Sequence, residues 1–332
     1  MSDAALAVRG LTVHFRVRRG LVGSRVVRAV DGVDLALGPG ETLGVAGESG
    51  SGKSTIARSL VHLTRPNGGT ITLGETDVTS LRGAALRRYR RRMQMVYQDP
   101  YDSLDPRMTV RDAIGEALAV RGLSRDRRPG EVARLLSRVN LPDALAARYP
   151  GQLSGGQRQR VSIARALAVE PDVIICDEAV AALDVSIRAQ VLNLLKDIQR
   201  DTGVAYLFIS HDLSTLRFVA DRVAIMYVGR VVEHGPSLEL FAEPLHPYTR
   251  ALIAAVPSVT ARGTKRLHLA GEPPDPANPP TGCPFHPRCP EAIDECRRVR
   301  PELTVVGPGR SVACHVAVRS FRSPRSAAEP SR

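Results

Sequence analysis

A glycine-rich loop between an apolar run and a helix-compatible segment carries the strongest chemical signal in the chain. Gly47-Glu48-Ser49-Gly50-Ser51-Gly52-Lys53-Ser54-Thr55 follows Leu43–Ala46 and matches the pattern G-x-x-x-x-G-K-[ST]. Glycines let backbone N–H groups turn inward around phosphate oxygens, and the following helix adds its positive end. Lys53 is expected to reach the β and γ phosphates of a nucleotide, and Ser54 to offer its hydroxyl to Mg²⁺. The alternative is a chance glycine-rich turn.

Two carboxylates follow a second apolar run. Val173–Cys176 is predicted to be a buried strand, and Asp177 and Glu178 come directly after it, where a parallel sheet presents its catalytic edge. Asp177 is expected to hold Mg²⁺, and Glu178 to orient and deprotonate an attacking water. The alternative is an acidic cap before a turn. His211 ends another predicted strand, Ala205–Ile209, and could bond the γ phosphate or be a structural histidine.

A second anion site is predicted far from the first. In Leu153-Ser154-Gly155-Gly156-Gln157, a serine and two glycines precede a helix predicted over Arg158–Ala168; a further helix is predicted over Ile187–Arg200. Two phosphate-binding elements so distant in sequence make sense if two chains face each other, each completing the other's site.

This Leu-Ser-Gly-Gly-Gln run is the signature of the ABC transporter ATPases, which the chain resembles from Ala7 to about Val256. The resemblance implies an α/β fold with a RecA-like P-loop ATPase core over 7–256 and a helical subdomain over about 100–165. It also implies ATP and Mg²⁺ as cofactors and hydrolysis of ATP to ADP and phosphate. Glu178, His211 and Lys53 are then the expected catalytic residues.

The resemblance assigns further roles residue by residue. Gln98 resembles the glutamine that contacts Mg²⁺ and senses the membrane subunits, so Ser54, Gln98 and Asp177 form the expected magnesium set. Phe15 is expected to stack on adenine, although an Arg-rich insertion follows it. The nucleotide-binding residues implied are Phe15, Gly47, Glu48, Ser49, Gly50, Ser51, Gly52, Lys53, Ser54, Thr55, Gln98, Ser154, Gly155, Gly156 and Gln157.

One loop departs from the usual pattern. Ala179-Val180-Ala181 stands where Pro-Thr-Ser is typical, just before Leu183-Asp184 of the loop that lies between the two active sites of such dimers. Ala181 has no hydroxyl to bond across the dimer. The departure bears on cross-talk between the sites and not on hydrolysis itself.

Four other runs resemble the oligopeptide and dipeptide importer branch of the family. They are Ala29–Val33, the Gly47-Glu48-Ser49-Gly50 form of the loop, Gln98–Arg107 and His246–Thr249. The branch implies a peripheral subunit on the cytoplasmic face of the membrane that energises peptide import. Its implied partners are two polytopic permease subunits, a second ATPase subunit and, indirectly, an extracellular binding protein. In this branch the two ATPases usually form a heterodimer of similar, non-identical subunits, and a homodimer is the alternative. The solute itself stays open.

The chain changes character near residue 257. From Pro257 onward lie 13 of the 24 prolines and four of the five cysteines. We therefore expect a separate, irregular module over 257–318 and a disordered end over 319–332, which is rich in Ser, Arg and Pro. The fifth cysteine, Cys176, is interpreted as a small apolar core residue.

The four late cysteines suggest a metal site. Cys283, Cys289, Cys296 and Cys314 are separated by five, six and 17 residues, and a cytoplasmic chain is not expected to hold stable disulfides. Thiolates select zinc or iron–sulfur clusters. The importer branch implies a [4Fe–4S] cluster, whereas the spacing alone suits zinc nearly as well, with His286 or His315 as substitute ligands. Free reduced thiols are the third possibility.

Composition leaves two other function classes to weigh. The net charge of +12 would suit an ATPase acting on DNA or ribosomes, but such proteins commonly carry two cassettes or large inserts, and no specific nucleic acid is expected here. A scaffold that binds ATP without cleaving it is disfavoured by Lys53, Asp177, Glu178 and His211. No run approaches the roughly 20 apolar residues that span a bilayer, so a membrane role is expected to depend on partners.

Overall fold

The computed structural model describes residues 4–19, 23–99, 103–255 and 271–322. Three segments about which the sequence made predictions are only partly covered by these residues. Residues 100–102 of the Gln98–Arg107 run, 257–270 of the expected C-terminal module and 323–332 of the expected disordered end lie outside the described residues.

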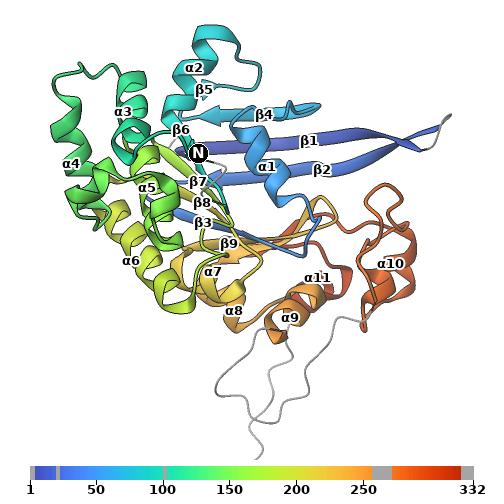
Figure 1. Cartoon of the computed structure of the whole chain (residues 1–332). Helices are drawn as coiled ribbons and strands as arrows, with labels where there is room; N and C mark the ends of the chain where they lie inside the picture. Colours follow the sequence, from blue (N-terminus) through green and yellow to red (C-terminus); the bar gives the residue numbers. More distant parts are fainter. Residues whose placement is uncertain (1–3, 20–22, 100–102, 256–270, 323–332) are drawn as a thin grey trace, which may run out of the picture.

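A mixed, mostly parallel sheet forms the centre of the molecule (Figure 1). Its strands are β3 (Thr42–Ala46), β6 (Met93–Val96), β7 (Val173–Asp177), β8 (Ala205–Ile209), β9 (Arg222–Tyr227), β10 (Arg230–Pro236), β11 (Thr304–Gly307) and β12 (Arg310–Val312). They lie in the order β11-β12-β10-β9-β3-β8-β7-β6. From β9 to β6 the strands pair in parallel, while β10, β12 and β11 continue the sheet in antiparallel fashion.

The predicted strands are confirmed, and their burial explains their composition. Every residue of β3, β7 and β8 is buried, which is why these strands are continuous apolar runs. Successive side chains point to opposite faces. Val173 and Ile175 therefore pack into one hydrophobic cluster, and Ile174 and Cys176 into the other. Cys176 is a core residue, as expected.

A second, antiparallel sheet covers one face. It contains β1 (Leu6–Arg19), β2 (Gly23–Leu37), β4 (Gly68–Leu73) and β5 (Thr76–Asp77) in the order β2-β1-β4-β5. The β1–β2 hairpin is long and projects beyond the remainder of the molecule (Figure 1). Helix α1 (Lys53–Leu60) lies between the two sheets, since its Ile56, Ala57 and Leu60 are buried in the cluster that both sheets share.

Helices cover the face of the central sheet opposite the antiparallel sheet, and some of them form a lateral group. This lateral group consists of α3 (Val110–Arg121), α4 (Arg128–Arg138), the short 3₁₀ turns η2 (Asp143–Ala147) and η3 (Pro150–Gln152), and α5 (Gly155–Leu167). Further helices are α2 (Gly83–Arg92), α6 (Val185–Thr202), α7 (Leu213–Val219), α8 (Ser237–Ala242) and α9 (Pro247–Ala254). The helices predicted over Arg158–Ala168 and Ile187–Arg200 are confirmed as α5 and α6. Both begin earlier than predicted.

The C-terminal region is less separate and less irregular than expected. It contains η4 (His286–Arg288), α10 (Asp294–Arg298), β11, β12 and α11 (His315–Arg322). Strand β12 pairs with β10, so the region extends the central sheet. Cys283, Phe285 and Cys296 pack into the same hydrophobic cluster as the ATPase helices. Residues 319–322, expected to be disordered, are helical. Among the described helices, none is long and apolar enough to cross a membrane.

Candidate functional site

The phosphate loop joins β3 to α1 and depends on its glycines. Gly52 has φ of 106°, a left-handed conformation that favours glycine, and a Cβ on it would collide with the Ala29 carbonyl. The Lys53 side chain folds back over the loop. Its Nζ donates to the carbonyls of Gly47 at 2.7 Å and Glu48 at 2.9 Å. The loop is therefore held around the ammonium group that is expected to meet the phosphates.

Residues 123 positions apart meet beside this lysine. Ser54 Oγ donates to Asp177 Oδ1 at 3.0 Å. Burial raises the pKa of Asp177, while the Ser54 hydrogen bond acts in the opposite direction. Burial also lowers the pKa of Lys53, opposed by Glu178, Asp177 and Glu48. A hydroxyl and a carboxylate side by side form the oxygen donor set that Mg²⁺ prefers, so these residues fit the cation expected here.

Glu178 lies at the end of β7 in a strained conformation. Its φ is 52°, which is uncommon for a residue with a side chain. Its N–H donates to the Ile209 carbonyl at 2.9 Å, which ties it to the neighbouring strand β8. Its Oε1 lies 3.0 Å from His211 Nδ1. The structure thus brings together the two residues that the sequence placed after separate strands.

Arg188 holds the loop that follows Glu178, a role that the sequence analysis missed. Arg188 Nη1 pairs with Asp212 Oδ2 at 3.0 Å, and Nη2 donates to the carbonyls of Ala181 at 3.5 Å and Leu183 at 3.2 Å. One guanidinium therefore connects the loop after β7 with the start of α7. The available signal was the unusual Ala179–Ala181 sequence. Its side chains have no polar groups, so a donor from elsewhere in the chain could have been expected for the backbone carbonyls of this loop.

Gln98 lies just after β6 and is exposed. The loop around it is fastened to α5: Gln159 Nε2 donates to the Tyr97 carbonyl at 3.5 Å, and Ser103 Oγ lies 2.8 Å from Ser162 Oγ. This places the predicted glutamine loop between the sheet and the lateral helices.

Ser154 begins α5, as the predicted second anion site requires. Its Oγ accepts from the Gln157 N–H at 3.2 Å, while Gln157 Oε1 accepts from the Ser154 N–H at 2.9 Å, a reciprocal capping box. The two glycines allow close packing, because a Cβ on Gly156 would lie 2.5 Å from Ile187 Cγ2. Hence the signature segment rests directly on the start of α6.

Phe15 lies on β1 opposite Val27. Phe15 is 40% exposed. Its expected role in stacking on adenine stays a prediction.

The C-terminal region contacts the phosphate loop, which sequence analysis did not foresee. Arg288 forms a two-pronged ion pair with Glu48, Nη1 to Oε2 at 2.8 Å and Nη2 to Oε1 at 3.0 Å. Tyr248 Oη accepts from the Glu48 N–H at 2.9 Å. The His246–Thr249 run was the available signal, although it was interpreted only as a branch marker.

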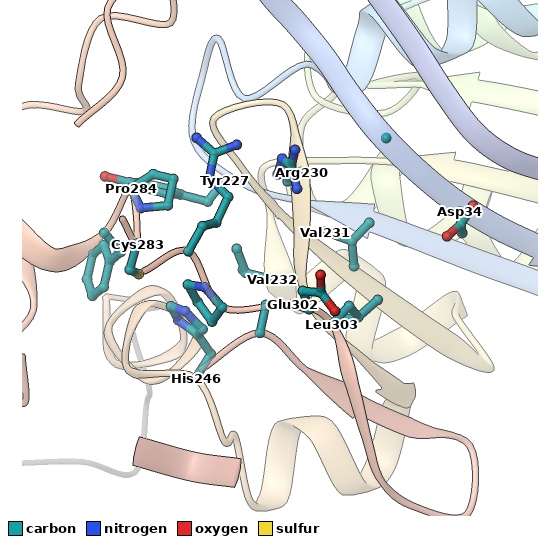
Figure 2. A pocket seen from close by; sticks show the side chains of 15 residues that line it. Asp34, Tyr227, Arg230, Val231, Val232, His246, Cys283, Pro284, Glu302 and Leu303 are labelled. Atoms are coloured by element: carbon teal, nitrogen blue, oxygen red, sulfur yellow. The ribbon is translucent and has the colours of Figure 1, made fainter. Parts of the chain in front are cut away.

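Two pockets lie along this contact. One, of about 420 Å³, is bounded by Glu48–Ser51 of the loop, Tyr227–Val228, and Glu272–Pro276 of the C-terminal region. The other, of about 360 Å³, lies between the β9–β10 hairpin and the C-terminal region (Figure 2). Cys283 and Pro284 line it from one side and Val231 and Val232 from the other. Tyr227 borders both pockets.

The four late cysteines are free thiols here. Burial, with smaller contributions from the neighbouring thiols of Cys296, Cys314 and Cys289, raises the pKa of Cys283 to about 11. In the part of the chain that the structure describes, however, no three Cys, His, Asp or Glu side chains are arranged to hold a metal ion. The predicted iron–sulfur or zinc ligand set is therefore not supported by this geometry.

Two family descriptions match the sequence. "ABC transporter" matches residues 30–181, and "Oligopeptide/dipeptide transporter, C-terminal region" matches residues 232–296. The chain is also 52% identical, over 99% of its own length and 93% of the relative's, to a protein of Sinorhizobium fredii named "Probable peptide ABC transporter ATP-binding protein".

Solved structures agree with this. The structure of CbiO1 from Clostridium perfringens, described as part of an ABC transporter complex, is 27% identical with a TM-score of 0.64 and covers 73% of this chain and 92% of that one. A dimeric post-hydrolysis state of the ATP-binding cassette MJ0796, bound to ADP and Pi, is 28% identical with a TM-score of 0.63 and covers 70% of this chain and 98% of that one.

Proposed function

Since the chain belongs to the ATP-binding proteins of the ABC transporter family, we propose that it powers the import of di- or oligopeptides through a membrane complex. Members of this family hydrolyse ATP, and this chain is an ABC ATPase. The observation that carries the chemistry is the meeting of Ser54, Asp177, Glu178 and His211 around Lys53. The peptide assignment is supported by the oligopeptide transporter match and the named relative.

Each side chain has a proposed task. Backbone N–H groups of the loop and Lys53 bind the phosphates, and the ammonium exchanges its carbonyl partners, Gly47 and Glu48, for phosphate oxygens. Ser54, Asp177 and Gln98 hold Mg²⁺, which when bound neutralises charge that develops on the phosphates. Glu178 accepts a proton from the attacking water.

His211 is proposed to orient Glu178. Its Nδ1 lies beside the Glu178 carboxylate, and its ring is more than half exposed, so it can also reach the γ phosphate of a bound nucleotide. The strained backbone of Glu178 and the Arg188 bridge keep that carboxylate at the strand end.

We propose that the working unit is a dimer of cassettes, with Ser154, Gly155 and Gly156 of one chain completing the nucleotide site of the other. Support comes from the helix start that these residues form and from the dimeric state of a similar cassette. The partner cassette is a similar or an identical subunit. The ATPase pair is proposed to bind two permease subunits at the cytoplasmic face, while an extracellular binding protein delivers the solute.

For the cysteines, we propose a structural metal group held by Cys283, Cys289, Cys296 and Cys314, either [4Fe–4S] or Zn²⁺. Its support is the soft thiolate donor set and the mutual effect of the thiols on their pKa values. Iron, sulfide and zinc analysis of anaerobically purified protein tests it. A stoichiometric metal content that is lost in Cys289→Ser supports the proposal, and metal-free folded protein refutes it.

The transport proposal is tested by purifying the tagged chain from its native membranes in gentle detergent and identifying the co-purifying proteins by mass spectrometry. Two polytopic membrane proteins, with or without a second cassette ATPase, support the importer. Ribosomes or DNA-bound proteins without any membrane subunit would replace it by the nucleic-acid function that the positive charge had suggested.

A further inference from the structure

The ion pair between Arg288 and Glu48 joins two segments that are 240 residues apart. The Arg288 side chain is only 6% exposed and that of Glu48 22%. By contrast, a second link from the C-terminal region, Arg25 to Asp275, is 46% exposed on both sides. Exposed pairs contribute little, whereas shielded two-pronged pairs of Arg and carboxylate fix geometry. The first pair is therefore the one able to position the loop.

Glu48 is held at three points. Its carboxylate meets Arg288, its N–H meets the Tyr248 hydroxyl, and its carbonyl accepts from Lys53 Nζ. A displacement of Glu48 would thus move a carbonyl that bonds the phosphate-binding lysine. It would also change the direction of a backbone N–H in the loop that surrounds the phosphates.

Arg288 is itself fixed by the cysteine region. It ends the η4 turn, in which His286 N–H donates to the Cys283 carbonyl at 3.0 Å and Arg288 N–H to the Phe285 carbonyl at 3.0 Å. Cys289 follows directly. The guanidinium lies 6.0 Å from the ring centroids of Tyr227 and Phe285 and donates to the Tyr227 hydroxyl at 3.3 Å. The turn between two cysteines thereby sets where the guanidinium points.

Charge gives the pair a second purpose. Glu48 is an acidic side chain in a loop that must accept a triphosphate, and its uncompensated carboxylate would repel that ligand. The hydrogen bonds to Glu48 raise the pKa of Arg288 above its usual value, so the guanidinium stays charged.

We propose that Arg288 is a positioning residue for ATP: through Glu48 it holds the phosphate loop in its binding shape, which makes nucleotide affinity depend on the folded cysteine region. This inference rests on the proposed function, because it concerns the same ATP site. It assigns to the C-terminal region a part in nucleotide binding.

The test is equilibrium binding of ATP to the purified full-length chain, with melting temperature measured in parallel. Arg288→Ala is expected to weaken ATP binding about tenfold, which corresponds to about 1.4 kcal/mol, and to raise KM more than it lowers kcat. Glu48→Gln, which retains the side chain's shape, is expected to weaken binding similarly. The double variant should be no worse than either single one, because both remove the same link.

Arg250→Ala is the matched control. Arg250 makes a two-pronged pair with Glu291 of the same C-terminal region, at 2.7 and 2.8 Å, without contacting the phosphate loop, so its ATP affinity should equal that of the wild type. Unchanged affinity in folded Arg288→Ala, tighter binding in Glu48→Gln, or independent effects in the double variant would overturn the proposal. If Arg288→Ala fails to fold, Glu48→Gln alone decides. Absence of ATP binding by the wild type would instead refute the proposed function.

Discussion

The Glu178 carboxylate and the His211 imidazole lie 3.0 Å apart, although they follow different strands, β7 and β8. The parallel pairing of these strands brings Asp177 opposite Ile209, so the residues after each strand meet at one sheet edge. The register of the sheet therefore brings together the two residues that are proposed to act as general base and orienting partner.

Removing the base should stop turnover and leave binding intact. Glu178→Gln keeps the size of the side chain but accepts no proton, so we expect ATP hydrolysis to fall by at least about 10²-fold, with ATP retained in a closed dimer. Steady-state hydrolysis and gel filtration with ATP measure this. Glu170→Gln is the control, because Glu170 also has φ of 52° but lies away from the site. Undiminished hydrolysis in Glu178→Gln would show that another group is the base.

Asp177→Asn should stabilise the nucleotide-free protein while abolishing magnesium-dependent hydrolysis. Burial raises the pKa of Asp177 above its ordinary 3.8. Between pH 3.8 and the raised pKa, the folded state therefore binds more protons than the unfolded state, and stability falls as pH rises through this range. Asparagine does not ionise. We therefore expect a gain of about 0.5–2 kcal/mol at neutral pH.

The pH profile is the check on that prediction. Denaturant unfolding of both proteins should show the difference in stability at neutral pH and its loss as pH falls through the raised pKa to well below 3.8, where Asp177 is protonated in the folded and unfolded states alike. A variant less stable than the wild type at neutral pH would mean that favourable contacts of the carboxylate outweigh its burial.

Gly156→Ala should destabilise the fold although alanine favours helices. The new methyl would lie 2.5 Å from Ile187 Cγ2, and a β-branched side chain moves reluctantly. Overpacking of this kind costs about 1–3 kcal/mol. Gly155→Ala is the control, since its methyl would lie 3.9 Å from Leu183 Cδ2. Thermal unfolding without nucleotide compares them; equal melting temperatures would contradict the packing described here.

Arg188→Ala should slow hydrolysis more than it weakens ATP binding, because it frees the Ala181 and Leu183 carbonyls beside Glu178. A fall of about tenfold or more in kcat is expected, as positioning errors near the base are costly. Arg200→Ala, on the same helix and in an exposed pair with Asp197, should behave like the wild type. An equal loss in both variants would remove the special role of Arg188.

Sequence reasoning reached the parts of the site that are local in the chain. The phosphate loop and the β7 carboxylates are each encoded in fewer than ten consecutive residues, and their glycines, lysine and apolar strands leave few alternatives. Arg288 was missed because its partner Glu48 is set by tertiary packing across 240 residues. Nothing near either residue indicates the other.

The C-terminal region shows the same limit. Strands β11 and β12 are short and lie in a proline-rich region, so the sequence did not predict them. Strand β12 pairs with β10, and β11 pairs with β12; the first of these is a long-range contact that composition does not record. The four late cysteines were predicted to form one metal site, and their geometry in the described residues does not support that prediction.

The most direct test is peptide uptake by vesicles that contain the chain with its cognate permeases and partner cassette, supplied with binding protein, labelled peptide and ATP. Wild-type vesicles should accumulate peptide only with ATP, and vesicles carrying Glu178→Gln should not. Hydrolysis of ATP without uptake of any peptide, across a panel of di- and oligopeptides, would contradict peptide import while leaving the ATPase assignment intact.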